Sequence, residues 1–397
     1  MEEQKVWGEK KVNLSSAIII GAVLAVIGVV LGANWNTWFG GFAPYLGFSN
    51  NNSEIDWSPL DEVYNKLAST YNGEISASEV IEGAKKGLTD SLGDKYTTYM
   101  GQEDAADFYD DLHGNVGSGI GVEMGLRDGY VRVLRTLPDN PARKAGILAG
   151  DILYKVDDEE VYQLSSEEIA KKVRGDKGTE VKVTVVRDGE EKSFTLVREE
   201  INNVSAYVEY DGSTAIVTVT RFDNDTGTKV QGFAQEFAKK NVKKVILDLR
   251  GNGGGYVNAA KDLLSLWLDG DTVWFQKSKH FDDVEEKAST GKAVLKDMKT
   301  VVLVNGTTAS ASEIAVGALQ DYKKATIVGE KTYGKGVVQN LYDLSGGSLL
   351  KVTTAAWYTP KDRSINEEGI EPDIKVERSY EDINAMRDPQ MDKAKEL

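Results

Sequence analysis

The stretch from Asn305 to Gln339 constrains the fold of this chain most strongly. The apolar run from Thr300 to Val304 predicts a strand that ends just before Gly306. Apolar residues then recur at helical spacing from Ile314 onward and predict a helix. Ser310 is therefore predicted to lie where a strand turns into a helix. Such a turn exposes a hydroxyl group together with several unpaired backbone N–H groups. Predicted strands and helices also alternate in the part of the chain before this stretch. Such alternation predicts an α/β core.

A lysine and a glutamine follow this turn. Glycines flank Lys335 on both sides and allow another backbone to approach closely, and Gln339 lies four residues later on the same face of a predicted strand. A serine hydroxyl needs an adjacent base, and a lysine supplies one when desolvation lowers its pKa. The pattern indicates Ser310 as nucleophile, Lys335 as base and Gln339 as the residue that orients the amine.

Two other interpretations of this stretch remain open. Ser310 and Glu313 form a capping box, so the serine could serve only to cap the helix. The run from Gly329 to Gly336 nearly spells a phosphate-binding loop. However, Gly336 stands where that loop needs a hydroxyl residue for magnesium, and a strand-like segment follows where it needs a helix. Nucleotide binding is therefore disfavoured.

The sequence Thr308-Ala-Ser-Ala-Ser-Glu-Ile314, followed by Gly334-Lys-Gly336 and Gln339, resembles the carboxy-terminal processing peptidases of family S41. These are serine proteases with a serine–lysine dyad. The resemblance implies that Ser310 is the nucleophile and Lys335 the base. It also implies a crotonase- or ClpP-like α/β catalytic core that carries an inserted domain.

A glycine-rich turn, Asp248-Leu-Arg-Gly-Asn-Gly-Gly-Gly255, lies between a predicted strand and a predicted helix. It lacks the third glycine of a dinucleotide fingerprint. The resemblance implies that this turn contributes an oxyanion-hole amide from Gly254, with the following glycine as the next candidate, and that the amide of Ala311 completes the pair. The alternative is a turn needed only for packing. We expect Asp248 and Arg250 to be structural.

The pattern from Phe108 to Val197 changes to short strands and interrupts the α/β alternation. This segment resembles a PDZ domain, which adds the C-terminal strand of a peptide to a sheet edge. The resemblance implies that the peptide carboxylate binds the backbone of Gly119, Ile120, Gly121 and Val122. Arg174 follows the predicted helix of the domain and is a candidate sensor that reports occupancy to the core. A spacer module and a solvated arginine are the alternatives.

The N-terminal region predicts a membrane anchor. Ala17 to Ala33 is an uncharged apolar run, preceded by lysines and followed by Trp35 and Trp38, which suit a membrane interface. A cleaved signal peptide is the alternative. Two amphipathic helices are predicted at Leu60–Leu67 and Val80–Leu92, and their apolar stripes need a partner, either the rest of the chain or a second copy in a homodimer.

Composition narrows the possible functions. The chain has 397 residues, a formal net charge of −16 and no cysteine, which disfavours nucleic-acid binding and excludes disulfides and thiolate chemistry. Its two histidines, His113 and His280, lie far from the nucleophile motif, so a Ser-His-Asp triad and a zinc site are disfavoured. We expect no cofactor and no metal.

We therefore predict a membrane-anchored serine endopeptidase that cleaves extracytoplasmic proteins near their C-termini and recognises free C-termini through its PDZ domain. The rival function is a catalytically silent PDZ adaptor, and a histidine-dependent trypsin-like protease is less well supported. Six segments are predicted: a cytoplasmic tail and transmembrane anchor (1–35), a linker (36–58), an N-terminal helical region (59–107), the PDZ domain (108–198), the peptidase core (199–380) and a disordered charged tail (381–397).

Overall fold

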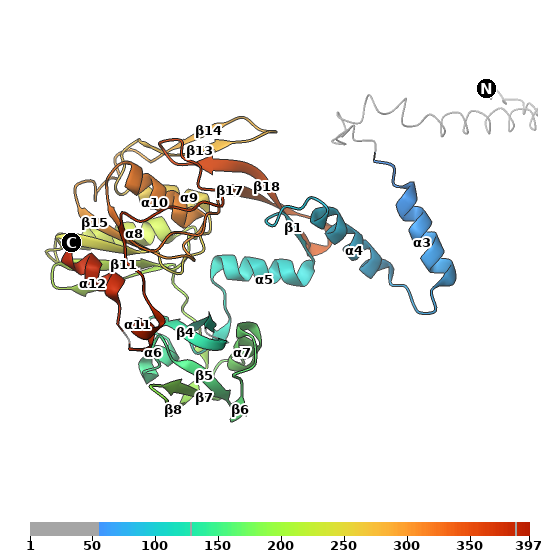
Figure 1. Cartoon of the computed structure of the whole chain (residues 1–397), viewed down its shortest axis with the longest axis horizontal. Helices are drawn as coiled ribbons and strands as arrows, with labels where there is room; N and C mark the ends of the chain where they lie inside the picture. Colours follow the sequence, from blue (N-terminus) through green and yellow to red (C-terminus); the bar gives the residue numbers. More distant parts are fainter. Residues whose placement is uncertain (1–54, 128, 386) are drawn as a thin grey trace, which may run out of the picture. The chain divides into compact units, whose positions relative to one another are not determined.

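The computed structural model describes residues 55–127, 129–385 and 387–397 (Figure 1). These residues divide into two units between Ser76 and Ala77. The predicted anchor, Ala17 to Ala33, lies outside the described residues. Within the described part of the chain, no helix combines the length and apolarity needed to cross a membrane.

The described part of the first unit contains helix α3 (Ser58–Thr70). Pro59 lies in its first turn, where the missing N–H group of proline costs no hydrogen bond. The helix confirms the first predicted amphipathic helix. Its apolar side chains Leu60, Val63 and Leu67 are exposed.

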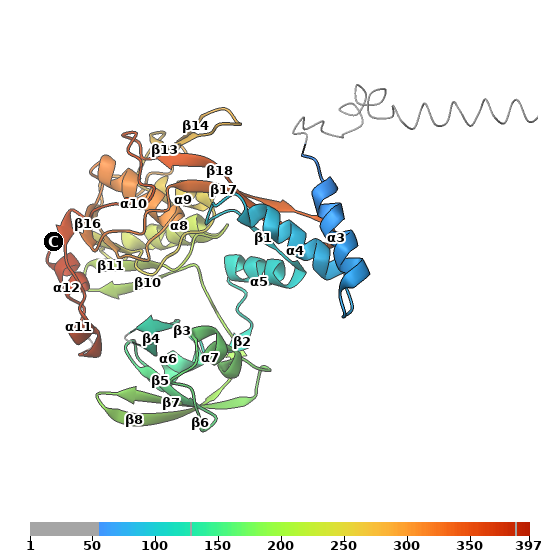
Figure 2. The same ribbon diagram turned by 45° about the vertical axis from the view of Figure 1, so that its right-hand side comes forward.

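The second unit begins with helix α4 (Ala77–Asp90), strand β1 (Thr98–Met100) and helix α5 (Gln102–His113). Helix α4 confirms the second predicted amphipathic helix, and its side chains Ile81 and Leu88 are exposed. Strand β1 pairs antiparallel with strand β18 (Leu349–Tyr358) of the core, so the residues that follow α4 belong to a core sheet (Figure 2).

A separate small domain follows α5. Its main sheet is antiparallel with the order β3-β4-β5-β7-β8, β6 pairs with β5, and β2 pairs with β9 where the chain leaves the domain. Its apolar cluster includes Ile120, Val133, Ile169 and Val183, and it is distinct from the cluster of the core. The elements are β2 (Ser118–Gly119), β3 (Val122–Arg127), β4 (Tyr130–Thr136), α6 (Pro141–Ala145), β5 (Ile152–Val156), β6 (Glu159–Glu160), α7 (Ser166–Val173), β7 (Glu180–Arg187), β8 (Glu190–Val197) and β9 (Glu199–Glu200).

The core confirms the predicted α/β architecture. Its main sheet has the order β10-β11-β12-β15-β16-β19, and every pairing in it except β10 with β11 is parallel. Parallel strands need crossover connections, and helices alternate with the strands in the chain. The elements are β10 (Ala206–Asp211), β11 (Thr214–Val219), α8 (Thr226–Phe237), β12 (Lys244–Asp248), α9 (Val257–Leu264), β15 (Lys299–Val304), α10 (Ala311–Asp321), β16 (Thr326–Gly329) and β19 (Ile374–Lys375).

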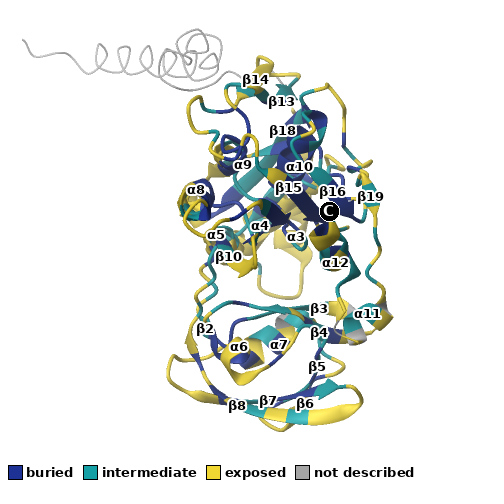
Figure 3. Cartoon of the chain, turned by 90° about the vertical axis from the view of Figure 1, so that its left-hand side faces the viewer, coloured by how far each residue is buried: buried dark blue, intermediate teal, exposed yellow. Residues whose placement is uncertain are grey.

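A second core sheet has the order β1-β18-β13-β14, with β17 also pairing with β18. Its strands are β13 (Thr272–Lys277), β14 (Val284–Lys287), β17 (Val337–Asp343) and β18 (Leu349–Tyr358), and a short 3-10 turn, η2 (Ser345–Gly347), connects the last two. The side chains of α9 and α10 lie in the large apolar cluster of the core, and Figure 3 shows both helices largely buried.

The prediction of a disordered tail was wrong. Residues after the last core strand form helices α11 (Tyr380–Asn384) and α12 (Pro389–Glu396). Ala394 of α12 is fully buried and packs, with Met391 and Leu397, in an apolar cluster with Ile246 of β12. These three apolar residues are spaced three apart, so the many charges of the segment hid a helix with one buried face.

Candidate active site

Ser310 lies between β15 and α10, as predicted. Its backbone carbonyl accepts the N–H groups of Glu313 and Ile314, at 2.8 and 3.0 Å, and these bonds begin α10. Its φ angle is 56°, a left-handed conformation that is uncommon outside glycine. Strained positions of this kind persist when the surrounding structure fixes them, and they concentrate at functional sites.

The contacts that fix this turn come from Glu313, whose side chain is fully buried. Its Oε2 atom accepts the backbone N–H groups of Ser310 and Lys335, each at 2.9 Å. Its Oε1 atom accepts the hydroxyl of Thr332 at 2.6 Å and the N–H group of Gly334 at 2.7 Å. One carboxylate therefore positions the backbones of the predicted nucleophile and the predicted base. The capping box in the sequence indicates only the first of these four bonds.

Lys335 is partly buried, and burial lowers the pKa of its amine. The neighbouring ammonium of Lys351 lowers that pKa further, whereas Glu313 acts in the opposite direction. The Nζ atom lies 5.3 Å from the centre of the Tyr96 ring, and the Lys335 carbonyl accepts the indole N–H of Trp357 at 3.0 Å. A lowered pKa is the shift that a lysine base requires.

Gln339 lies on β17, and its Nε2 atom donates a hydrogen bond to the Tyr96 carbonyl. The structure thus brings Ser310 and Lys335 together through Glu313, and it brings Lys335 and Gln339 together around Tyr96. Among the described residues, no hydrogen bond joins the Ser310 hydroxyl to the Lys335 amine or the Lys335 amine to Gln339.

The glycine-rich turn reaches Ser310. Gly254 has a φ angle of 107°, and a Cβ atom placed on it would lie 2.8 Å from the Ser310 Cβ and 3.1 Å from the Ala311 nitrogen. The Gly254 N–H group donates to the Asn252 side-chain oxygen at 2.9 Å. Asn252, in turn, accepts the Ala309 N–H through its backbone carbonyl at 3.0 Å. Gly254 and Ala311 are therefore adjacent to Ser310, with the Gly254 amide engaged by Asn252.

Asp248 and Arg250, which precede the glycines of this turn, have structural contacts, as expected. The guanidinium of Arg250 donates to both carboxylate oxygens of Asp248, at 2.9 and 2.7 Å. It also reaches Asp388 at 2.8 Å and Gln390 at 3.0 Å, which lie at the start of α12. These bonds attach the C-terminal helix to the glycine-rich turn.

The predicted carboxylate-binding loop, Gly119–Val122, lines a cavity of about 280 Å³. Within the described chain, the N–H groups of Ile120 and Gly121 donate no hydrogen bond. Gly121 has a φ angle of 76°, and a Cβ atom there would lie 2.2 Å from the Asn140 Cβ, so only glycine fits. The loop that lines the cavity therefore carries two backbone donors with no acceptor among the described residues.

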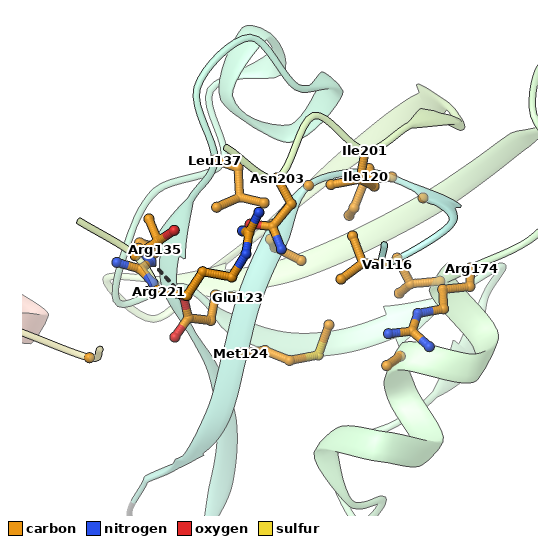
Figure 4. A pocket seen from close by; sticks show the side chains of 17 residues that line it. Val116, Ile120, Glu123, Met124, Arg135, Leu137, Arg174, Ile201, Asn203 and Arg221 are labelled. Carbon is orange, nitrogen blue, oxygen red and sulfur yellow. Dashed lines mark hydrogen bonds and ion pairs between the residues drawn. The ribbon is translucent and has the colours of Figure 1, made fainter. Parts of the chain in front are cut away.

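The cavity has walls from both the small domain and the core. Figure 4 shows Arg174 on the α7 side, and Arg135 and Arg221 on the opposite side. Arg135 pairs with Glu123 at 2.5 Å, whereas no ion pair of Arg174 is found among the described residues. Gly251, from the glycine-rich turn of the core, also lines the cavity.

The chain is 33% identical over 394 residues to a Staphylococcus aureus protein named "Probable CtpA-like serine protease", an alignment that covers 97% of this chain and 78% of the relative. A Staphylococcus saprophyticus protein of the same name is 32% identical over 372 residues, covering 93% and 73% of the two chains. The chain belongs to the S41 peptidases. It is a serine-type peptidase with a PDZ domain.

Family models match separate parts of this S41 peptidase. They are Peptidase family S41 at residues 213–376, PDZ domain at 118–197 and Activating protease CtpB N-terminal domain at 47–104. The structure is also similar to the photosystem II D1 C-terminal processing protease, with a TM-score of 0.55 and 27% identity over 83% of this chain and 90% of that one. The sequence-based assignment to the carboxy-terminal processing peptidases is confirmed.

Proposed function

We propose that this S41 peptidase is a membrane-anchored endopeptidase that cleaves extracytoplasmic proteins near their C-termini with a Ser310–Lys335 dyad. Ser310 attacks the scissile carbonyl, and Lys335 takes the hydroxyl proton and later gives it to the leaving amine. Gln339 orients the Lys335 amine. Water then hydrolyses the acyl-enzyme. The observation that carries this proposal is the shared bond to Glu313, which positions the backbones of both dyad residues.

The N–H groups of Gly254 and Ala311 hold the oxyanion in this mechanism. The Gly254 amide must first leave Asn252, and the Ser310 hydroxyl must approach the Lys335 amine. We therefore propose that the described arrangement precedes an active one, and that the two differ by local movements at the glycine-rich turn and at the base.

The PDZ domain recognises free C-termini of protein substrates in the cavity beside Gly119, Ile120, Gly121 and Val122. Support comes from the backbone donors of this loop and from the cationic Arg174 at the cavity wall. A peptide carboxylate is complementary to both. We also propose that Arg174 acts as a sensor of a bound peptide. Residues of the core, Arg221 and Gly251, line the same cavity and could respond to its occupancy.

The segment Ala17 to Ala33 anchors the protein, with the catalytic domain on the extracytoplasmic side. Its uncharged apolar run and flanking tryptophans support this part of the proposal. The apolar side chains of α3 and α4 are exposed in the described chain, and we propose that a second copy covers them in a homodimer. The predicted segment boundaries stand as part of the same proposal, with α12 now assigned to the folded core.

Incubation of the protein with unfolded substrates tests this function. The wild-type protein is expected to release fragments, whereas Ser310→Ala is expected to release none and to bind C-terminal peptides with unchanged affinity. The rival adaptor function predicts peptide binding without hydrolysis by either protein. Equal fragment release by wild type and Ser310→Ala would exclude Ser310 as the nucleophile.

A further inference from the structure

The turn formed by residues 94–97, far from the dyad in sequence, lies against Lys335, the proposed base. The Asp94 carboxylate accepts the N–H group of Tyr96 at 3.0 Å. It also accepts the N–H and hydroxyl groups of Thr97, at 3.2 and 2.6 Å. An aspartate that bonds the backbone two and three residues later stabilises a turn, so the position of Tyr96 is set locally.

The same turn is bonded to the catalytic sheet. The Thr97 hydroxyl oxygen accepts the N–H group of Thr353 on β18 at 3.0 Å. Strand β1 then pairs Thr98 with Lys351 of β18, and the neighbouring strand β17 places Gln339 opposite Thr353. Because β18 lies between β1 and β17, Tyr96 has a fixed place beside the proposed catalytic group, which consists of Ser310, Lys335 and Gln339.

Tyr96 contacts two members of that group in different ways. The centre of its ring lies 5.3 Å from the Lys335 Nζ, and its carbonyl accepts the Gln339 Nε2 donor. An amide whose nitrogen is bonded to one partner presents its oxygen in another direction. That oxygen is the atom of Gln339 that accepts a hydrogen bond from an amine.

We propose that Tyr96 is a positioning residue for Lys335 and Gln339: its ring keeps water from the amine, and its carbonyl sets the orientation of the amide. This inference rests on the proposed dyad. The Tyr96 hydroxyl is buried and has no hydrogen-bond partner among the described residues, so the ring and the backbone carry the role.

The charged groups around the amine come from several elements. Lys351 faces it from β18 and Glu313 from α10, and the Lys95 Nζ lies 5.0 Å from the centre of the Tyr96 ring. A ring over an ammonium also favours the charged form, which opposes the effect of desolvation. Burial is the largest cause of the lowered Lys335 pKa, so removal of the ring is expected to raise that pKa.

The test measures the full-length protein in detergent and compares Tyr96→Leu with Tyr99→Leu. Tyr99 is a matched control, because it lies three residues later and its hydroxyl bonds to Glu82 rather than to the proposed catalytic group. For Tyr96→Leu, kcat/KM at neutral pH is expected to fall about tenfold, a typical scale for weakened general-base catalysis, and the midpoint of the pH–rate profile is expected to move to higher pH. Tyr99→Leu is expected to keep the wild-type midpoint. Tyr96→Phe, which retains the ring, is also expected to keep it.

A second readout does not need turnover. The rate of acetylation of Lys335 by acetic anhydride, followed by mass spectrometry across pH, reports when its amine loses its proton. The acetylation midpoint is expected to rise in Tyr96→Leu and to stay at the wild-type value in Tyr99→Leu. Unchanged midpoints in folded Tyr96→Leu would overturn the role of Tyr96.

If Tyr96→Leu fails to fold, Thr97→Val gives the same test, because it removes the bond between the turn and Thr353. Its acetylation midpoint should also rise, and a wild-type value would count against the proposal. Failure of the proposed function has a different signature. Turnover would then persist in Lys335→Ala, while acetylation would still report whether Tyr96 shields the amine.

Discussion

Lys335 donates its backbone N–H group to the Oε2 atom of Glu313 at 2.9 Å, and the same oxygen accepts the N–H group of Ser310 at the same distance. A buried carboxylate that accepts several backbone donors exchanges strong bonds to water for charge-assisted bonds within the protein. The arrangement fixes the backbones of the proposed nucleophile and base relative to each other, although the two residues come from different elements.

We expect Glu313→Gln to damage both the fold and the site. The neutral amide keeps one acceptor atom but directs an NH₂ group at backbone donors, which leaves buried donors unpaired at a cost of about 1–3 kcal/mol each. Urea unfolding and kcat/KM measure the two effects. Glu371→Gln changes an exposed carboxylate paired with Lys331 and serves as the control. Equal stability and activity in both variants would contradict the role of Glu313.

Gly254 and Gly253 offer a comparison within one turn. A Cβ atom at Gly254 would lie 2.8 Å from the Ser310 Cβ, and the positive φ angle there adds strain, whereas a Cβ atom at Gly253 would meet nothing within 4 Å. Gly254→Ala is therefore expected to lower kcat by roughly 100-fold, the scale of a lost oxyanion-hole donor. Gly253→Ala is expected to retain activity. Comparable turnover by the two variants would show that the close approach of Gly254 is unimportant.

The pH dependence expected of the proposed lysine base follows from the lowered pKa of Lys335, caused first by burial and then by Lys351. Activity should rise with pH and reach half its maximum below the ordinary lysine pKa. Lys351→Met removes a neighbouring positive charge, so the midpoint of the pH–rate profile should move to higher pH. A shift to lower pH would mean that Lys351 affects the proposed base in some other way than through its charge.

The same pKa predicts a trend in stability. The unfolded chain, with an ordinary lysine pKa, binds more protons than the folded chain between the two pKa values of Lys335. The free energy of unfolding should therefore gain a rising contribution as pH increases through that window. Lys335→Met should remove this contribution, and urea unfolding at several pH values measures the difference. An identical pH slope in the variant would contradict the shift.

Part of this site could be predicted from sequence because its signals are local. Ser310 lies at a strand-to-helix turn and Gly254 in a glycine-rich turn, and both have short sequence patterns. Glu313 was predicted only as a helix cap, because its bonds to Gly334 and Lys335 depend on how two distant segments pack. The contact of Tyr96 with Gln339 joins residues 243 positions apart, and nothing in the local pattern indicates it.

Helix α12 escaped prediction for a different reason. Its charged residues suggested a solvated tail, but the fully buried Ala394 packs beside Ile246. Ala394→Asp places a carboxylate in this apolar cluster and is expected to lower the free energy of unfolding by about 2–5 kcal/mol. Glu396→Ala, at an exposed position of the same helix, is the control. Equal unfolding midpoints in urea would contradict the packing of α12.

The serine–lysine dyad is the central claim, and turnover of an unfolded protein substrate by Lys335→Ala tests it most directly. Lys331→Ala is the matched control, because Lys331 lies four residues earlier and pairs only at the surface with Glu371 among the described residues. We predict that Lys335→Ala keeps the circular dichroism spectrum of the folded protein and loses hydrolysis, while Lys331→Ala hydrolyses like wild type. Wild-type turnover by folded Lys335→Ala would contradict the dyad.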